Sequence, residues 1–232
     1  MPSRIEVKIC GLTRRQDAEA AAALGAGYLG VVLTPGFARS VSTREAGPLL
    51  AGLSVTPVAV LVDEAPARAE ALARTLGAGV IQLHGSEAPE AVAELARRGP
   101  WRLWKSVRAR DPDDVREAAE RYGPWVHGIL VEGAREGVLG GGGARLDPAS
   151  FPDLRSLVPA PLRLILAGGL RAETVAAAVD HFAPDVVDVS SGVEVEPGRK
   201  GPELVGRFIQ EALRARPQAA GPGTPDRTGA PT

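Results

Sequence analysis

The only cysteine of this sequence lies where a reactive side chain would be useful. Cys10 ends a short apolar run and precedes Gly11. Because side chains alternate along a strand, Lys8 and Cys10 share one face and Ile9 lies on the other. An ammonium group beside a thiol favours the thiolate, so we expect Lys8 to lower the pKa of Cys10. A buried cysteine that acts as a small apolar side chain is the alternative.

A carboxyl group ends another apolar run. Glu132 closes the stretch VHGILVE, and the loop after it contains four consecutive glycines, which indicates a mobile cover over a ligand. Asp147 follows these glycines. A thiol and a carboxyl group that face each other, without a nucleotide-binding fingerprint, fit paired proton transfers. This pair indicates an isomerase or a lyase.

Small residues end two later apolar runs, in AGGL at 167–170 and DVSSGVE at 188–194. Glycine and serine let backbone N–H groups approach an anion, so both stretches indicate a phosphate site. Arg39, in TPGFARSVS, could bind a carboxylate or a phosphate in a forked geometry. The substrate predicted from these residues is a small phosphorylated metabolite.

Gln82 and His84 share a face at the end of a further run, IQLH. A hydrogen-bonded loop histidine is the alternative to a role for His84 in the site. Three scattered histidines and one cysteine do not make a metal site, so we expect no metal.

Eight apolar runs alternate with alanine-rich helical segments, which predicts eight β-α repeats. The expected strands are 5–10, 28–33, 56–62, 79–84, 101–107, 126–132, 162–168 and 185–191. A closed (β/α)8 TIM barrel over residues 1–216 is the economical arrangement, and an open doubly wound sheet is the alternative. Residues 217–232 are rich in proline and glycine, and we expect a disordered tail.

Two helix starts carry a capping-box pattern. Thr13 with Gln16 predicts one start, and Ser42 with Glu45 predicts another.

Composition excludes several classes of protein. The 232 residues are 44% apolar and 24% charged, with a net charge of -1 and no basic block, so nucleic acid is not an expected partner. No apolar run approaches the length of a membrane span, and one cysteine excludes an intrachain disulfide. The start lacks the apolar segment of a signal peptide, so we expect a cytoplasmic protein.

The stretches KICGLTR, GVVLTPGFARSVS, IQLHG, LAGGL and VDVSSGVE occur in this order between residue 8 and about residue 200. Together they resemble phosphoribosylanthranilate isomerase of tryptophan biosynthesis. The resemblance implies an Amadori rearrangement, in which the ribosylamine ring opens and a carboxyphenylamino-deoxyribulose phosphate forms. It implies no cofactor, because the substrate's own nitrogen accepts the electrons.

The resemblance also assigns roles to residues. Cys10 matches the general base, Arg39 the arginine that holds the anthranilate carboxylate, and Asp188 an aspartate close to the sugar hydroxyls. Gln82 and His84 are expected at the substrate. The residues matching the phosphate site are Gly168, Gly169, Ser190, Ser191 and Gly192.

The sequence departs from the family at the general acid, where an aspartate is expected and Glu132 stands. The acid must carry a proton near neutral pH, so we expect burial or the substrate phosphate to raise its pKa. Asp147 is the alternative acid. The glycine-rich loop lacks the lysine and aromatic residues that often follow the family's glycines.

Other functions remain open from the sequence alone. Indole-glycerol-phosphate synthase requires a catalytic lysine and usually an extra N-terminal helix, and the histidine-pathway isomerase requires an aspartate where Cys10 stands. A non-catalytic sugar-phosphate binding module and a redox thiol protein are further alternatives. Family members occur as monomers, dimers and fused chains, so a homodimer is one of the expected states.

Overall fold

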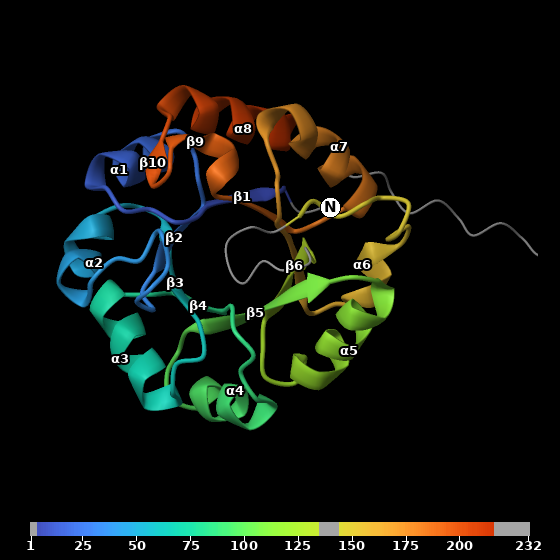
Figure 1. Ribbon diagram of the computed structural model, residues 1–232, viewed down its shortest axis with the longest axis horizontal. Helices are drawn as coiled ribbons and strands as arrows, with labels where there is room; N and C mark the ends of the chain where they lie inside the picture. The colour runs from blue at the N-terminus through green and yellow to red at the C-terminus, as the bar shows by residue number, and fades with distance from the viewer. Residues whose placement is uncertain (1–3, 135–143, 216–232) are drawn as a thin grey trace, which may run out of the picture.

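The computed structural model describes residues 4–134 and 144–215. Its strands form a closed parallel barrel in chain order, β1 to β8, which confirms the predicted (β/α)8 TIM barrel (Figure 1). The strands are β1 (Glu6–Ile9), β2 (Tyr28–Val32), β3 (Thr56–Leu61), β4 (Val80–Leu83), β5 (Arg102–Ala109), β6 (Gly128–Gly133), β7 (Arg163–Leu166) and β8 (Val186–Val189).

The α-helices form a ring outside the strands, as crossovers between parallel strands require (Figure 1). They are α1 (Arg15–Ala23), α2 (Thr43–Leu50), α3 (Pro66–Leu76), α4 (Pro89–Ala96), α5 (Pro112–Tyr122), α6 (Leu154–Leu157), α7 (Ala172–Phe182) and α8 (Pro202–Arg214). The connection from β8 to α8 adds a 3-10 turn, η1 (Ser191–Val193), and a small hairpin of β9 (Glu194–Glu196) and β10 (Arg199–Lys200), which the sequence pattern did not predict.

Strand alternation divides the core into two layers. Residues on the outer face of the barrel pack under the helices, as Ile9, Leu29 and Ile129 do. Residues on the inner face form a separate buried cluster, in which the rings of Tyr28 and Trp104 lie 5.0 Å apart. This inner cluster fills the barrel, so functional side chains are confined to the C-terminal ends of the strands and the loops beyond them.

One of the two predicted helix caps is confirmed. Ser42 and Glu45 form the predicted capping box of α2. The prediction for Thr13 with Gln16 is wrong, because α1 begins at Arg15 and the Thr13 hydroxyl donates to the carbonyl of Gly198, 2.8 Å away. The sequence did not show that the β9–β10 hairpin would offer Thr13 a different acceptor.

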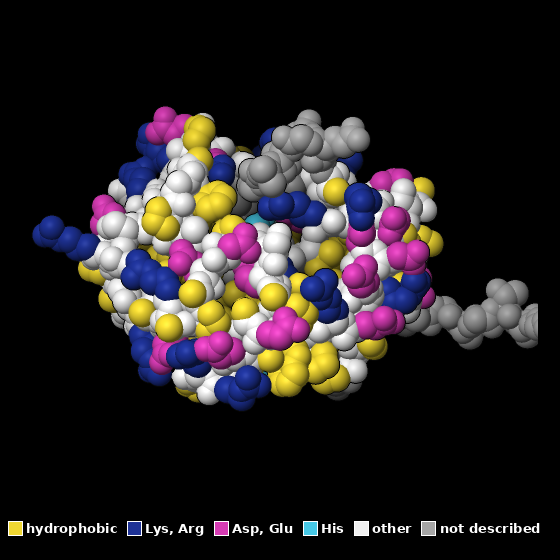
Figure 2. Space-filling view, turned by 60° about the horizontal axis from the view of Figure 1, so that its bottom comes forward, with side chains coloured by type: hydrophobic (Ala, Val, Ile, Leu, Met, Phe, Trp, Pro, Cys, Tyr) yellow, Lys and Arg dark blue, Asp and Glu magenta, His cyan; other side chains and the backbone are white. Residues whose placement is uncertain are grey.

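Charges of both signs are mixed on the described surface, as expected from a sequence without a basic block. Acidic and basic side chains alternate over the face shown in Figure 2, with no large area of one sign. No helix among residues 4–134 and 144–215 is long and apolar enough to cross a bilayer. The predicted loop cover falls largely on residues 135–143 and the predicted tail on 217–232, both outside the described residues.

Candidate active site

Cys10 lies directly after β1, on the inner face of the barrel, and is 8% exposed. Lys8, one inward position below it, is fully buried and donates to Asp188 Oδ1 of β8 at 2.8 Å. The two residues are register partners in the β1–β8 pair. Gly30 of β2 leaves space for the thiol, because a Cβ there would lie 2.9 Å from Cys10 Sγ.

The electrostatics of Cys10 differ from the sequence expectation. Burial raises the pKa of the Cys10 thiol, and the charge of Asp188 adds to this effect. Lys8 lowers the pKa as expected, but it does not outweigh burial, so the net shift is upward. The expectation of a lowered pKa was therefore wrong, because burial outweighs the ammonium of Lys8.

Glu132 lies near the end of β6 on the inner face and is 6% exposed. Its Oε1 is 3.5 Å from His84 Nε2 and 3.2 Å from Arg108 Nε. His84 is oriented by the Gln82 amide, whose Nε2 lies 2.9 Å from His84 Nδ1. An amide donor on Nδ1 leaves the ring proton of a neutral imidazole on Nε2, where it faces Glu132.

The pKa of Glu132 also moves against the expectation. Burial raises it, but the hydrogen bond and charge of His84 and the guanidinium of Arg108 outweigh burial, so the pKa lies below its ordinary value. The predicted raised pKa was wrong, because two donor side chains from other strands, His84 and Arg108, contact this carboxylate.

Asp147, the alternative acid, is exposed and bonded within its own turn. Its carboxylate accepts from the Ser150 hydroxyl at 2.7 Å and from the Ala149 amide at 3.2 Å. These contacts lower the pKa of Asp147. Asp147 is therefore an exposed carboxylate bonded within its own turn, whereas Glu132 is buried on the inner face of the barrel.

The predicted phosphate residues surround the ends of β7 and β8. Gly168 and Gly169 have φ values of 87° and 58°, in the left-handed region that glycine adopts without strain. Among the described residues, their amides have no backbone acceptor. Ser190 follows β8, and Ser191 and Gly192 begin η1. The buried ammonium of Lys200 lies behind them, 3.1 Å from the Ser190 carbonyl.

Arg39 is held in place by Glu194. Its Nε and Nη2 each lie 2.7 Å from an oxygen of that carboxylate, which Lys200 Nζ also contacts at 2.8 Å. Burial raises the pKa of Glu194, but hydrogen bonds from Arg39 and Lys200 reverse the shift and lower the pKa to about 2. The Nη1 of Arg39 takes no part in this forked pair, so it can still donate to a ligand.

Two residues predicted to contact the substrate, Gln82 and Asp188, are paired with other side chains of the protein. Gln82 is 1% exposed and its amide contacts His84, so it reaches the site through the imidazole. Asp188 is 8% exposed and is paired with Lys8, at the base of the mouth below Cys10. The other predicted residues lie at strand ends on the same side of the barrel.

Three charged residues that were not predicted from the sequence also shape the site. Arg108 was missed because the fifth strand was predicted to end at 107, whereas β5 continues to Ala109 and brings Arg108 onto the inner face beside Glu132. Extending the alternation of side chains along the fifth strand from Trp104 would have placed Arg108 on the inner face. Glu194 and Lys200 follow β8, and only the β9–β10 hairpin brings them together. Within the described ranges, no group of three or more His, Cys, Asp and Glu side chains could hold a metal ion.

The chain is similar to known proteins over most of its length. Residues 7–211 match the family model described as N-(5'-phosphoribosyl)anthranilate (PRA) isomerase. A relative of that name from Chromohalobacter salexigens is 40% identical, covering 90% of this chain and 94% of its own. Another from Halorhodospira halophila is 39% identical, covering 91% and 98%.

Solved structures are similar over the same span. Phosphoribosyl anthranilate isomerase from Thermotoga maritima superposes with a TM-score of 0.80 at 32% identity, covering 90% of this chain and 98% of that one. A complex of such an enzyme with reduced 1-(o-carboxyphenylamino)-1-deoxyribulose 5-phosphate gives 0.77 at 31% identity, with the same coverage. The Thermotoga enzyme is described as dimeric.

Proposed function

The chain belongs to the phosphoribosylanthranilate isomerase family, and from this premise we propose how its own residues carry out the reaction. It is an isomerase of tryptophan biosynthesis. It converts N-(5'-phosphoribosyl)anthranilate to 1-(o-carboxyphenylamino)-1-deoxyribulose 5-phosphate by an Amadori rearrangement.

Glu132 is the general acid. It protonates the ring oxygen of the ribosylamine while the nitrogen lone pair forms the carbon–nitrogen double bond, so the furanose opens to an iminium. The extra methylene of glutamate lengthens the side chain relative to the family's aspartate. Contacts from His84 and Arg108 fix where that longer side chain ends. Positioning matters, because an error near 1 Å can lower a rate by about 10²-fold.

Cys10 is the general base. It removes the proton from the sugar carbon next to the iminium, and the electrons of that bond move toward the nitrogen. The resulting enolamine becomes the ketone by tautomerisation. The substrate's nitrogen donates its lone pair when the ring opens and takes an electron pair back when the proton is removed, so the proposed mechanism needs neither metal nor cofactor.

The proton has to change places before catalysis. The raised pKa of Cys10 favours a proton on the thiol and the lowered pKa of Glu132 favours an ionised carboxylate, whereas the reaction needs the opposite distribution. Both distributions place one proton on the pair, so no proton has to be taken from solvent. We infer that the negative charge of the bound substrate raises the pKa of Glu132 and shifts the proton toward it.

The remaining site residues bind the two ends of the substrate. Arg39 donates through Nη1 to the anthranilate carboxylate while Glu194 holds its other nitrogens. The phosphate takes the amides around Gly168 and Gly169 and those of Ser190, Ser191 and Gly192, with Lys200 adding positive charge. Asp188 lies next to the sugar hydroxyls.

The observation that carries this proposal is the pairing of a buried thiol beside Lys8 and Asp188 with a buried carboxylate beside His84 at one end of the barrel. The test follows the loss of anthranilate-type fluorescence from freshly made phosphoribosylanthranilate. We expect the wild type to turn over and Glu132→Gln to lose at least about 10²-fold in kcat. Asp147→Asn is the matched control and should retain activity. Activity in Glu132→Gln with loss in Asp147→Asn would move the acid to Asp147.

We also propose a cytoplasmic enzyme that acts on a small phosphorylated substrate, without nucleic acid or a membrane as partner. Residues 1–216 would be the catalytic domain and 217–232 an accessory tail. Sedimentation of the purified chain distinguishes a monomer from a homodimer such as the Thermotoga relative.

A further inference from the structure

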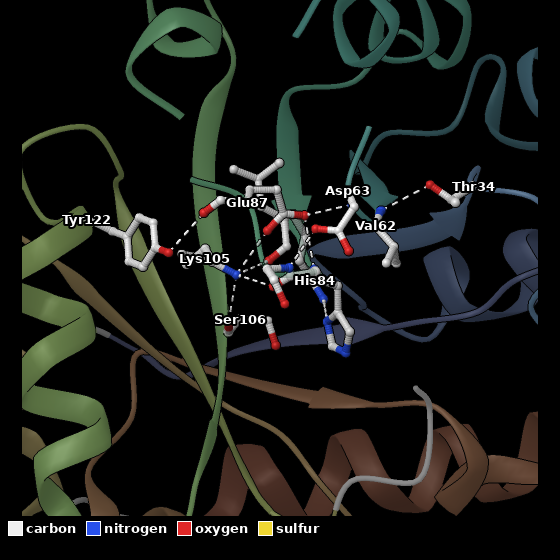
Figure 3. Close-up of polar contacts among 12 residues, drawn as sticks. Thr34, Val62, Asp63, His84, Glu87, Lys105, Ser106 and Tyr122 are labelled. Carbon is white, nitrogen blue, oxygen red and sulfur yellow. Dashed lines mark hydrogen bonds and ion pairs between the residues drawn. The ribbon is translucent and has the colours of Figure 1, made fainter. Parts of the chain in front are cut away.

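A buried ion pair lies outside the barrel wall, next to the acid side of the site. Lys105 of β5 is 3% exposed and Glu87, in the turn before α4, is 8% exposed. Lys105 Nζ lies 3.0 Å from Glu87 Oε2 (Figure 3). On β5, Trp104 belongs to the inner cluster, so Lys105 points outward, away from the substrate's entrance. The pair is too enclosed and wrongly directed to touch substrate.

Both members of the pair hold the turn that follows His84. Glu87 Oε1 accepts from the Gly85 amide at 3.0 Å, and Lys105 donates to the Gly85 carbonyl at 2.8 Å. The backbone on the other side of His84 is also fixed, since the His84 amide donates to the Leu61 carbonyl at 2.7 Å. The backbone that carries the imidazole is therefore fixed from both directions.

Neighbouring contacts tie the same turn to β3 and α5. Glu87 Oε1 also accepts from the Asp63 amide at 3.2 Å, and the Tyr122 hydroxyl donates to the Glu87 carbonyl at 2.9 Å (Figure 3). The backbone packs so closely that a Cβ at Gly85 would lie 2.7 Å from the Asp63 nitrogen. The turn therefore has little freedom to move while these contacts hold.

We propose that Lys105 and Glu87 are positioning residues for the acid step, which hold the β4–α4 turn so that His84 stays against Glu132. The contact they protect is long, 3.5 Å from His84 Nε2 to Glu132 Oε1, and a small displacement of the turn would break it. This inference rests on the proposed role of Glu132.

The test uses the variant Lys105→Met/Glu87→Leu, because removing both charges avoids leaving one buried and unpaired. We expect kcat to fall about 10-fold while KM changes less than about twofold, since the turn acts on positioning and not on binding. The control is Arg155→Met, which removes an ion pair with Asp185 outside the site. That control should lower the melting temperature and leave kcat unchanged.

A second readout reports the imidazole itself. The chain has three histidines, so 15N NMR of the rings can be assigned with His84→Asn as the reference. At alkaline pH, the wild type should show His84 with its proton on Nε2 and two well-separated nitrogen signals. In the double variant these signals should move together as the tautomers mix. Arg155→Met should retain the separated signals.

The outcomes separate the two proposals. Unchanged His84 signals and unchanged kcat in the double variant would overturn the positioning role. A loss of kcat that adds fully to that of His84→Asn would also overturn it, since the pair would then act by another route. Mixed His84 signals, found together with an active Glu132→Gln enzyme, would support the positioning and reject only the role of Glu132. If the double variant does not fold, Glu87→Gln is measured instead, with the same direction expected.

Discussion

The two sides of the mouth are built differently. On the base side, Lys8 and Asp188 are strand residues paired directly across β1 and β8, and both are buried. On the acid side, Glu132 is contacted by His84, which follows β4, and by Arg108, whose side chain is 36% exposed. The strands β1 and β8 position the base side directly. The acid side depends instead on the turn after His84, which Lys105 and Glu87 hold in place.

This difference also sets the direction of the two pKa shifts. Burial dominates at Cys10 and raises its pKa, while contacts overcome burial at Glu132 and lower its pKa. The burial of Cys10 cannot be changed without changing the core around it. A contact of Glu132 can be removed by one substitution, because the side chain of Arg108 is partly exposed. Replacing Cys10 or Glu132 should therefore remove most of the activity, whereas removing a contact of Glu132, such as Arg108, should shift its pKa and leave much of the activity.

The largest expected effect is on the base side. Cys10→Ser replaces the thiol by a hydroxyl of much higher pKa, so we expect kcat to fall by at least about 10²-fold with little change in KM. Steady-state kinetics with freshly prepared substrate measures this. Near-normal turnover would remove Cys10 from the mechanism.

Arg39→Ala should produce the next largest effect, on binding. Loss of a charged hydrogen bond to a carboxylate corresponds to about 1.5–3 kcal/mol, or roughly 10-fold to 100-fold in affinity. We expect the loss for ligands that carry anthranilate and much less for ribose 5-phosphate, measured by calorimetry. Equal losses for both ligands would refute the carboxylate role and would indicate that Arg39 acts through the neighbouring phosphate site.

Arg108→Met tests the difference between the two sides of the mouth through the pH dependence of kcat/KM. Below the pKa of Glu132 both catalytic groups are protonated and no base remains, and above the pKa of Cys10 both are ionised and no acid remains. The acidic limb of kcat/KM therefore reports Glu132 and the alkaline limb reports Cys10. Removing Arg108 raises the pKa of Glu132, so the acidic limb should move to higher pH.

The alkaline limb should stay in place in the same variant, because Arg108 does not contact Cys10. The substrate's own ionisation cancels when the variant and the wild type are compared. Arg110→Met is the matched control, since the exposed Arg110 follows the same strand and pairs with the partly buried Asp114 of α5. A shift of both limbs in Arg108→Met would contradict the division of the site into two independent sides.

The smallest expected effect is on stability. The pKa of Glu194 is about 2 in the folded protein, below its ordinary value. A carboxylate with a depressed pKa stabilises the fold above its unfolded pKa and loses this contribution as pH falls through its folded pKa. The wild type should thus lose stability between about pH 4.5 and about pH 2. Glu194→Gln should lose less over that window, which melting temperatures would show.

Much of the barrel could be predicted from the sequence, because the relevant physics is local. Apolar runs of four to eight residues between helical segments specify parallel strands, and alternation places Lys8 and Cys10 on one face. The Ser42–Glu45 cap was predictable for the same reason, since its partners are three residues apart. The error at Thr13 arose where a distant residue, Gly198, competed with the local cap.

The site was predictable in position but not in its electrostatics. Strand ends carry the functional groups of such barrels, so Cys10 and Glu132 could be found from their places alone. The end of a strand is the least certain part of a sequence prediction, and a two-residue error hid Arg108. The pKa directions depend on burial and on partners from other strands, which no spacing along the chain encodes.

The sequence by itself therefore determined the eight strands, the inward faces and the residue types at the mouth, because these follow from local periodicity and from the chemistry of side chains. Only the tertiary structure decided that Lys8 meets Asp188 across 180 positions of chain, and that Lys105 and Glu87 fix the turn after His84. Closing the barrel brings such distant residues together, and the resulting burial and contacts set their charges. Burial and long-range contacts also decide the directions in which the pKa values of Cys10 and Glu132 move.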